Sequence, residues 1–257
     1  MLELIAANTG KVLVQGHRGA LGHAPENTMV SFAKGVELGA DLIELDIHMS
    51  SDGHLVVMHD GDVSRTTDGQ GHLKDMTLAE IRKLDAGIRF SKRFRGERVP
   101  TLEEVLAWAK GRIPLVVEIK GDPLPPLGIE AKLVELVRAY GLVDDVMAIS
   151  FHHPVVRRVK ELEPAMATGI LYSACLADTV GAARAALADS VRPHRSFLTA
   201  ADVAAAHSAG LAVSAWVVND FETLERLMAM GIDSVGSDYP DRLRAYLDRV
   251  GRGWPRS

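Results

Sequence analysis

The sequence predicts an α/β protein built as a TIM, or (β/α)8, barrel. Short apolar runs alternate with amphipathic segments along the chain, which is the pattern of parallel strands covered by helices. The 257 residues match the usual size of one such barrel, about 250 residues. The glycine-rich motifs GxGxxG and GxxxxGK(S/T), which would favour an open doubly wound sheet, are absent from the sequence. We therefore expect a single domain over residues 1–257.

Eight short runs of apolar and β-branched residues have the length of buried parallel strands. They cover residues 12–16, 42–47, 115–119, 146–150, 168–172, 188–192, 211–217 and 232–236. Helical patterns lie between or after them, at residues 28–39, 101–110, 129–140, 153–162, 178–187, 199–209, 219–230 and 240–249. In such a barrel, polar residues at the ends of the strands meet at one face, which is where the chemistry takes place.

The second predicted strand is followed by an apolar run at 55–59 that cannot be the next barrel strand. Only residues 50–54 separate the two runs, whereas a parallel crossover needs about a dozen residues or more. Residues 55–59 are therefore expected to return as the antiparallel arm of a hairpin, with a turn at Ser-Asp-Gly. This arm would bring His59 close to Asp46. The polar residues 61–100, with a helical stretch at 77–85, are expected to form an insertion that caps the active face.

Composition and charge argue against several classes of protein. The net charge is −5 without a long basic tract, so nucleic acid is not an expected partner. No apolar run reaches the roughly 20 residues of a membrane span, so stable membrane insertion is not expected. Residues 1–14 lack the charged and apolar regions of a signal peptide. The single cysteine, Cys175, cannot form an internal disulfide. We expect a cytoplasmic protein, whose oligomeric state the sequence does not indicate.

Three carboxylates near the ends of neighbouring predicted strands form a candidate metal site. Glu44 and Asp46 are two residues apart on one strand, so their side chains point to the same face. Glu118 lies near the end of the next barrel strand. Buried carboxylates placed together repel one another unless a proton or a cation intervenes. An oxygen-rich site without cysteine suits one Mg²⁺ or Ca²⁺ ion, with Mn²⁺ as a further option, rather than Zn²⁺. The alternative is an ion-pair network with Arg18 and Lys120.

Two histidines and two basic residues accompany these acids. His17 and Arg18 end the first strand, and His59 ends the hairpin arm. A histidine can accept or donate a proton near neutral pH, and the guanidinium of Arg18 matches the oxygens of a phosphate. Lys120 points to the same face as Glu118, where its partner is either a substrate phosphate or an acid. If His17 and His59 flank a phosphate, one can activate the attacking oxygen while the other protonates the leaving alkoxide.

Several further residues near the predicted strand ends carry weaker signals. Phe151 and Trp216 lie at the ends of strands and are expected to line the substrate pocket, although core packing explains them equally well. Asp238 follows the last strand and is expected to cap the final helix. His48 is expected at the surface or in a loop.

The segment 25–28, Pro-Glu-Asn-Thr, opens the first predicted helix. Either Asn27 or Thr28 is available as its N-cap. Glu26 lies close in sequence to His17 and Arg18, so its carboxylate could orient that pair by hydrogen bonding.

These residues fall within a series of motifs that resembles the glycerophosphodiester phosphodiesterase family, especially its bacterial cytoplasmic members. The motifs are HRG at 17–19, PENT at 25–28, ELD at 44–46, HD at 59–60, EIK at 118–120, WVVN at 216–219 and SDYP at 237–240. The resemblance covers nearly the whole chain. It implies a TIM barrel that hydrolyses glycerophosphodiesters, such as glycerophosphocholine or glycerophosphoethanolamine, to sn-glycerol 3-phosphate and an alcohol.

The resemblance also implies a role for each matching residue. It implies that His17 and His59 are the acid–base pair. It implies that Glu44, Asp46 and Glu118 bind the divalent cation. Arg18 and Lys120 would contact the phosphate. The sequence does not indicate which alcohol is preferred, or whether water or the glycerol hydroxyl attacks first.

Two alternative functions stay open. A phospholipase D-like enzyme acting on lysophospholipids or sphingomyelin would use the same histidines and cation. It would also need a lipid-facing surface, and the sequence has no evident exposed amphipathic stretch of that kind. A non-catalytic barrel could bind phosphodiesters as a sensor, but such a protein has little need of both histidines.

Overall fold

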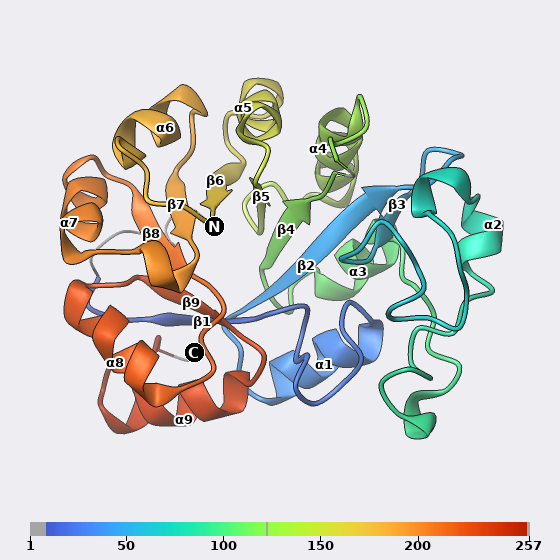
Figure 1. The fold of residues 1–257 in the computed structure, drawn as a ribbon, viewed down its shortest axis with the longest axis horizontal. Helices are drawn as coiled ribbons and strands as arrows, with labels where there is room; N and C mark the ends of the chain where they lie inside the picture. The colour runs from blue at the N-terminus through green and yellow to red at the C-terminus, as the bar shows by residue number, and fades with distance from the viewer. Residues whose placement is uncertain (1–8, 122, 256–257) are drawn as a thin grey trace.

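The computed structural model describes residues 9–121 and 123–255 and has the predicted TIM barrel architecture (Figure 1). Residues 1–8, which are part of the segment predicted not to be a signal peptide, lie outside the described residues. The parallel strands are β1 Leu13–Gly16, β2 Leu42–Met49, β4 Leu115–Ile119, β5 Val146–Ser150, β6 Ala167–Tyr172, β7 Ser190–Pro193, β8 Ala212–Ala215 and β9 Ser234–Ser237. β1 pairs with β9 on one side and with β2 on the other, which closes the barrel.

The expected hairpin is confirmed. β3, Leu55–Val57, runs antiparallel to β2, with Val57 opposite Ile47. The turn between them is made possible by Gly53, whose φ of +82° lies in the left-handed region. After β3, the amide of Met58 donates a hydrogen bond to the carbonyl of Asp46 at 3.0 Å. This bond places the next residue, His59, at the level of Asp46, as the length of the connection predicted.

Helices follow the parallel strands and form a ring around them in Figure 1. The longer ones are α1 Met29–Glu37, α3 Leu102–Ala109, α4 Ile129–Tyr140, α5 His153–Leu162, α6 Thr179–Ala185, α7 Ala200–Ser208, α8 Phe221–Met230 and α9 Pro240–Arg249. Thr28 is the N-cap of α1: its hydroxyl accepts a hydrogen bond from the amide of Ser31. Thr101 caps α3 in a capping box with Glu104. Hydroxyl side chains therefore fix the start of both helices.

The segment between β3 and α3 contains only short elements, and it lies beside the hairpin in Figure 1. These are η1 Leu73–Asp75, α2 Leu78–Ile81 and η2 Lys92–Phe94; a further 3₁₀ turn, η3 Arg195–Phe197, follows β7. The helix expected at 77–85 is thus much shorter. The carboxylate of Asp85 accepts hydrogen bonds from the amides of Gly87, Ile88 and Gly96. A side chain that binds the backbone in this way competes with helix formation.

The two faces of the strands have different surroundings. Ile43, Leu45 and Ile47 of β2 pack outward in the large apolar cluster that includes α3 and α4. Leu42 belongs instead to the small cluster of residues on the other face of the strands. Because side chains alternate along a strand, Glu44 and Asp46 share this inward face with Leu42. The barrel interior therefore carries charged groups toward one end of β2.

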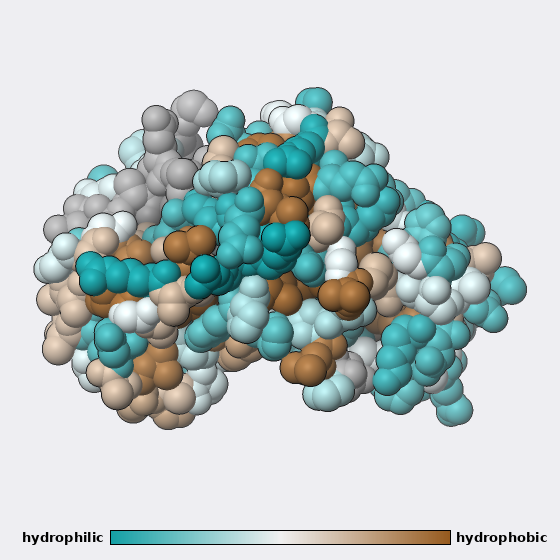
Figure 2. Space-filling view, turned by 90° about the horizontal axis from the view of Figure 1, so that it is seen from above, coloured by the Kyte–Doolittle hydropathy of each residue, from teal (hydrophilic) through white to brown (hydrophobic). Residues whose placement is uncertain are grey.

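The surface mixes polar and apolar residues. In the view of Figure 2, apolar residues form separate patches between hydrophilic ones. Among the described residues, no helix has both the length and the apolar character needed to cross a bilayer.

Candidate active site

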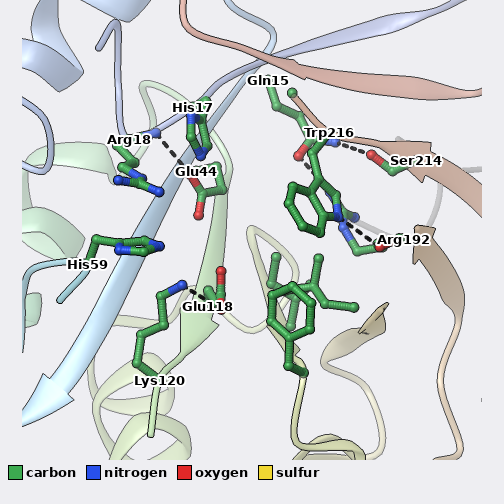
Figure 3. Close-up of a pocket in the computed structure, with 14 residues that line it drawn as sticks. Gln15, His17, Arg18, Glu44, His59, Glu118, Lys120, Arg192, Ser214 and Trp216 are labelled. Carbon is green, nitrogen blue, oxygen red and sulfur yellow. Dashed lines mark hydrogen bonds and ion pairs between the residues drawn. The ribbon is translucent and has the colours of Figure 1, made fainter. Parts of the chain in front are cut away.

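A pocket opens at the ends of the parallel strands, and side chains from most of them point into it (Figure 3). It is lined by Gln15, His17, Arg18, Glu44, His59, Glu118, Lys120, Ile149, Phe151, Leu171, Arg192, Ser214, Trp216 and Gly236. The predicted site residues thus come together, with Asp46 buried directly beside Glu118, its partner in the β2–β4 register. Figure 3 places His17, Arg18, Glu44, His59, Glu118 and Lys120 on one side of the pocket, with Trp216 and Arg192 opposite them.

The three predicted metal-binding carboxylates form one compact group. Potential ligand oxygens of Glu44, Asp46 and Glu118 all lie within 4.8 Å of one another. All three side chains are buried. The parallel pairing of β2 with β4 is responsible, because it sets Asp46 level with Glu118 and leaves Glu44 one pleat below on the same face.

Burial makes this concentration of negative charge unfavourable. Loss of hydration raises the pKa of Glu44, and the neighbouring charge of Asp46 adds to the effect. Burial likewise raises the pKa of Glu118 to about 8, against the opposing effect of Lys120. Burial also disfavours ionisation of Asp46, but Lys120 and Arg18 outweigh it and hold the pKa of Asp46 well below its usual range. The group therefore favours the binding of a proton or a cation.

The contacts of these carboxylates fit a hard divalent cation. The ammonium of Lys120 lies 2.7 Å from Glu118 Oε1 and 3.1 Å from Asp46 Oδ1. Asp46 Oδ1 is buried and accepts no hydrogen bond beyond this ion pair. Carboxylate oxygens are the ligands that Mg²⁺ and Ca²⁺ prefer. The ion-pair network that the sequence left as an alternative exists: Lys120 contacts Glu118 and Asp46, and Arg18 Nε lies 3.5 Å from Asp46 Oδ2. It supplies two cationic side chains for three buried carboxylates.

His17 is held by a residue for which the sequence predicted a different role. Its Nδ1 lies 2.6 Å from Asp238 Oδ1. Asp238 was expected to cap the final helix, and this prediction was wrong: the N-cap position of α9 is Tyr239, without a side-chain hydrogen bond. Pro240 at the start of α9 has no amide hydrogen to satisfy, so a capping side chain is less needed. Asp238 instead accepts hydrogen bonds from His17 and, at 2.7 Å, from Asn219 Nδ2.

His59 has the same arrangement at the end of the hairpin arm. Its Nδ1 lies 2.6 Å from Oδ1 of Asp60, the next residue. The backbone carbonyl of His59 lies 3.1 Å from Nε2 of His48. His48 is buried on β2, so the expectation that it lies at the surface or in a loop was wrong. It packs under the hairpin arm that carries His59.

Ionised aspartates fix the tautomer of both histidines. Burial acts to raise the pKa of Asp60, but hydrogen bonds from Arg65 and His59 outweigh it and lower the pKa of Asp60 to about 2. The pKa of Asp238 is lowered in the same way, mainly by its contact with His17, which outweighs burial. A carboxylate only accepts hydrogen bonds, so Nδ1 of each ring carries the proton. Nε2 of each neutral ring is then the proton acceptor available to the pocket.

Asn27 belongs to this site, although the sequence offered it only as a possible N-cap. Its Nδ2 donates to Asp46 Oδ2 at 2.8 Å, and its Oδ1 accepts from the amide of Asp46 at 3.2 Å. Asn27 is buried and has a φ of +57°. The one sequence signal for this role is that asparagine tolerates the left-handed conformation better than most residues. Arg18, at a φ of +50°, donates its amide to Glu44 Oε2 at 2.8 Å.

The far side of the pocket is partly apolar and has a polar floor. The rings of Phe151 and Trp216 meet edge to face, with centroids 5.5 Å apart. Below them, Arg192 donates to Gln15 Oε1 at 2.5 Å and to the sulfur of Met147 at 3.0 Å. Burial lowers the pKa of Arg192 to about 10. Arg192 and Gln15 are not among the predicted site residues, because a polar residue within a β-branched run gives no sign of facing a pocket.

The sequence model of the glycerophosphoryl diester phosphodiesterase family matches residues 17–242, which include every predicted site residue. The chain belongs to this family. A glycerophosphodiester phosphodiesterase from Caldanaerobacter subterraneus subsp. tengcongensis is 41% identical over 234 residues, which are 91% of this chain and 96% of that protein. Another, from Bacillus subtilis, is 34% identical over 249 residues, covering 90% of this chain and 85% of that protein.

Solved structures agree with this glycerophosphodiester phosphodiesterase assignment. A phosphodiesterase from Oleispira antarctica, in complex with the product sn-glycerol-3-phosphate, has a TM-score of 0.86 and 31% identity, covering 93% of this chain and 97% of that chain. A putative glycerophosphoryl diester phosphodiesterase from Silicibacter pomeroyi has a TM-score of 0.89 and 28% identity, covering 99% of both chains. The family resemblance inferred from the sequence motifs is confirmed.

Proposed function

We propose that this glycerophosphodiester phosphodiesterase hydrolyses glycerophosphodiesters to sn-glycerol 3-phosphate and an alcohol in the pocket of Figure 3. Family membership and the product complex of the Oleispira relative support the reaction. The observation that carries the assignment to this pocket is the pair of histidines. His17 and His59 each lie 2.6 Å from an aspartate, and both line one cavity with the carboxylate group and two basic side chains.

Glu44, Asp46 and Glu118 are the residues that would hold one divalent cation, either Mg²⁺ or Ca²⁺, with Mn²⁺ as a further option. When bound, the cation supplies positive charge that offsets the charge building on the phosphoryl oxygens. Arg18 and Lys120 line the same pocket and bring further positive charge to the phosphate. These side chains are fixed before the substrate arrives, so little reorganisation is needed during the reaction.

The two histidines would carry the protons of the reaction. The attacking oxygen, whether of water or of a glycerol hydroxyl, must lose a proton, and the leaving alkoxide must gain one. Burial lowers the pKa of His59, with Lys120 and Arg18 adding to the effect against Asp46. His59 is therefore neutral near pH 7, with Nε2 free to accept a proton. The pair can exchange roles in a second step, since each ring is supported by its own carboxylate.

Phe151 and Trp216 would bind the carbon skeleton of the substrate. Phe151 is 47% exposed, which is more than an aromatic residue of the core would show. Trp216 is held in place by a hydrogen bond of 2.9 Å from its Nε1 to the carbonyl of Arg192. Together they form an apolar wall opposite the charged side chains.

Lysophospholipids are the second candidate substrates. A second cavity of about 400 Å³ shares Lys120 and Phe151 with the first, and Pro123 and Pro125 line it. On the same loop, Leu124 and Leu127 are 64% and 97% exposed. These two exposed leucines beside the cavity suit a substrate with an acyl chain, which the sequence alone did not indicate.

The test is the release of sn-glycerol 3-phosphate from glycerophosphocholine and glycerophosphoethanolamine, and of choline from lysophosphatidylcholine. Wild type and His17→Ala are compared after EDTA treatment and after addition of Mg²⁺, Ca²⁺ or Mn²⁺. We expect activity that disappears with EDTA, returns with a cation and is absent in His17→Ala. Choline release from lysophosphatidylcholine alone would establish the lysophospholipid reading instead. Binding of substrate without any turnover would leave the non-catalytic barrel as the better explanation.

A further inference from the structure

Arg65 connects two carboxylates, each of which contacts a residue of the pocket. It lies in the segment 61–100, and its guanidinium contacts two carboxylates from separate parts of the chain. Nη1 and Nη2 donate to the two oxygens of Glu26, at 2.8 and 2.7 Å. Nε donates to Asp60 Oδ2. One side chain therefore ties the loop before α1 to the end of the hairpin arm.

Each of these carboxylates also holds a residue of the pocket. The other oxygen of Asp60 contacts His59 Nδ1 at 2.6 Å. Glu26 Oε1 accepts a hydrogen bond from Nη1 of Arg18 at 2.8 Å. The contacts thus run without a break from His59 through Asp60, Arg65 and Glu26 to Arg18.

The chemistry of these contacts favours a fixed geometry over a loose surface pair. A bidentate guanidinium–carboxylate pair holds both partners in one plane. The side chain of Arg65 is 47% exposed, but that of Glu26, which receives the pair, is only 10% exposed. The backbone around Arg65 is also anchored: Val63 is buried in the small apolar cluster of the insertion, and its carbonyl accepts a hydrogen bond of 2.7 Å from the hydroxyl of Thr67. Arg65 itself touches neither the pocket nor the carboxylate group.

We propose that Arg65 is a positioning residue that holds His59 and Arg18 in their relative places across the phosphate. The proposal rests on the proposed function. It gives the first part of the insertion a catalytic purpose, since Arg65 would act through Asp60 on the acid–base histidine and through Glu26 on the phosphate-binding arginine. A Lys in its place could neutralise one carboxylate but could not form the planar fork that joins both.

The first test compares Arg65→Ala and Arg65→Lys with Arg89→Ala. Arg89 is a matched control, because it lies in the same insertion and donates its Nε to a backbone carbonyl, that of Thr67. We expect Arg65→Ala to lower kcat on the best diester by roughly 10- to 100-fold, the usual effect of losing an outer partner of a site residue. Arg65→Lys recovers part of this loss, millimolar guanidinium partly rescues Arg65→Ala, and Arg89→Ala keeps wild-type kcat.

A double-mutant cycle separates positioning from general stability. If Arg65 acts through Asp60 and Glu26, then adding Arg65→Ala to the pair Asp60→Asn and Glu26→Gln lowers kcat little further. Full additivity of the losses would overturn the proposal. So would a fall in the melting temperature of Arg65→Ala with kcat unchanged.

A measurement without turnover keeps the proposal testable if the wild type fails to cleave any diester. In nitrogen-15 NMR spectra of the histidine rings, His59 should show the proton on Nδ1 in wild type and in Arg89→Ala. In Arg65→Ala this preference should weaken. An unchanged His59 signal would show that Asp60 holds the ring without help from Arg65. Inactivity of the wild type with the expected NMR change would instead reject the proposed function alone.

Discussion

Each histidine of the site has an aspartate on Nδ1, and the two aspartates lie far apart in the sequence. Asp60 adjoins His59 in sequence, whereas Asp238 is 221 residues away from His17. A neutral imidazole can present a basic nitrogen to the pocket only if its other nitrogen keeps the proton. The aspartates therefore decide whether either ring can take part in proton transfer.

Replacing Asp238 with Asn should reduce kcat far more than it changes KM. The amide can donate to Nδ1 of His17, which would move the ring proton to Nε2 and block proton acceptance in the pocket. We expect a loss on the order of 100-fold or more, by analogy with other aspartate–histidine pairs. The matched control is Asp220→Asn, because Asp220 caps α8 through the amide of Thr223. Equal kcat in the two variants would contradict this role of Asp238.

Removing one of the three clustered carboxylates should abolish the stabilisation of the folded protein by divalent cations. Glu44, Asp46 and Glu118 have oxygens within 4.8 Å of one another, so each is expected to contribute to one ion. A ligand at about 100 times its Kd stabilises the folded protein by about 2.7 kcal/mol. We expect Mg²⁺ or Ca²⁺ to raise the melting temperature of metal-depleted wild type but not of Glu118→Gln. A cation-dependent shift of the same size in both would place the ion elsewhere.

Asp60 gives the molecule an acid-sensitive contribution to stability. Its pKa falls from an ordinary 3.8 to about 2 in the folded protein. A carboxyl group with a lowered pKa stabilises the fold above its unfolded pKa, and the contribution disappears as the pH falls through its folded pKa. Wild type should therefore lose more stability than Asp60→Asn between about pH 4 and pH 2, measured by urea unfolding. Parallel curves for the two proteins over this range would contradict the assignment.

At the scale of elements, the β2–β3 hairpin brings His59 into the site. His59 lies two residues after a strand, β3, that is not part of the barrel, and its position depends on the turn at 50–54. The sequence predicted this correctly because the connection is too short for any alternative. The helix expected at 77–85 is shorter in the structure, where Asp85 lies outside it and accepts a hydrogen bond from the amide of Gly96, eleven residues further on. The local sequence pattern does not show such a contact. The contacts of Asp238 and Arg192 could not be predicted from the sequence for the same reason, because their partners lie far away in the chain.

The turn itself can be tested at Gly53. This residue has a φ of +82°, and a Cβ placed there would meet no atom within 4 Å. Gly53→Ala should therefore cost about 1 kcal/mol through backbone strain alone. Gly53→Asn should cost less, because asparagine tolerates the left-handed region better. Urea unfolding measures both, and an equal loss for the two residues would indicate that something other than φ limits this position.

At the scale of the whole molecule, the two ends of the barrel have different tasks. The pocket lies at the carboxyl ends of the strands, whereas Asp41 precedes β2 at the opposite end. Asp41 Oδ2 accepts the amide of Val14 at 2.9 Å, and Asp41 Oδ1 accepts from Arg244 Nη1 at 2.7 Å. Arg244, on α9, also donates to the carbonyl of Trp254 at 2.6 Å. This cluster joins β1, β2 and the last helix where the barrel closes.

Arg244→Leu should therefore destabilise the protein without changing its chemistry. The side chains of Asp41 and Arg244 are 8% and 7% exposed, so the substitution takes the guanidinium away from a buried carboxylate. Breaking a buried ion pair in this way costs about 3–5 kcal/mol. Below the melting transition kcat should stay at the wild-type value, because the substitution lies at the end of the barrel away from the pocket. The variant Asp41→Asn with Arg244→Leu should recover part of the stability, since no buried charge is then left without its guanidinium. A fall in kcat at a temperature where Arg244→Leu is fully folded would mean that barrel closure and the catalytic face are coupled.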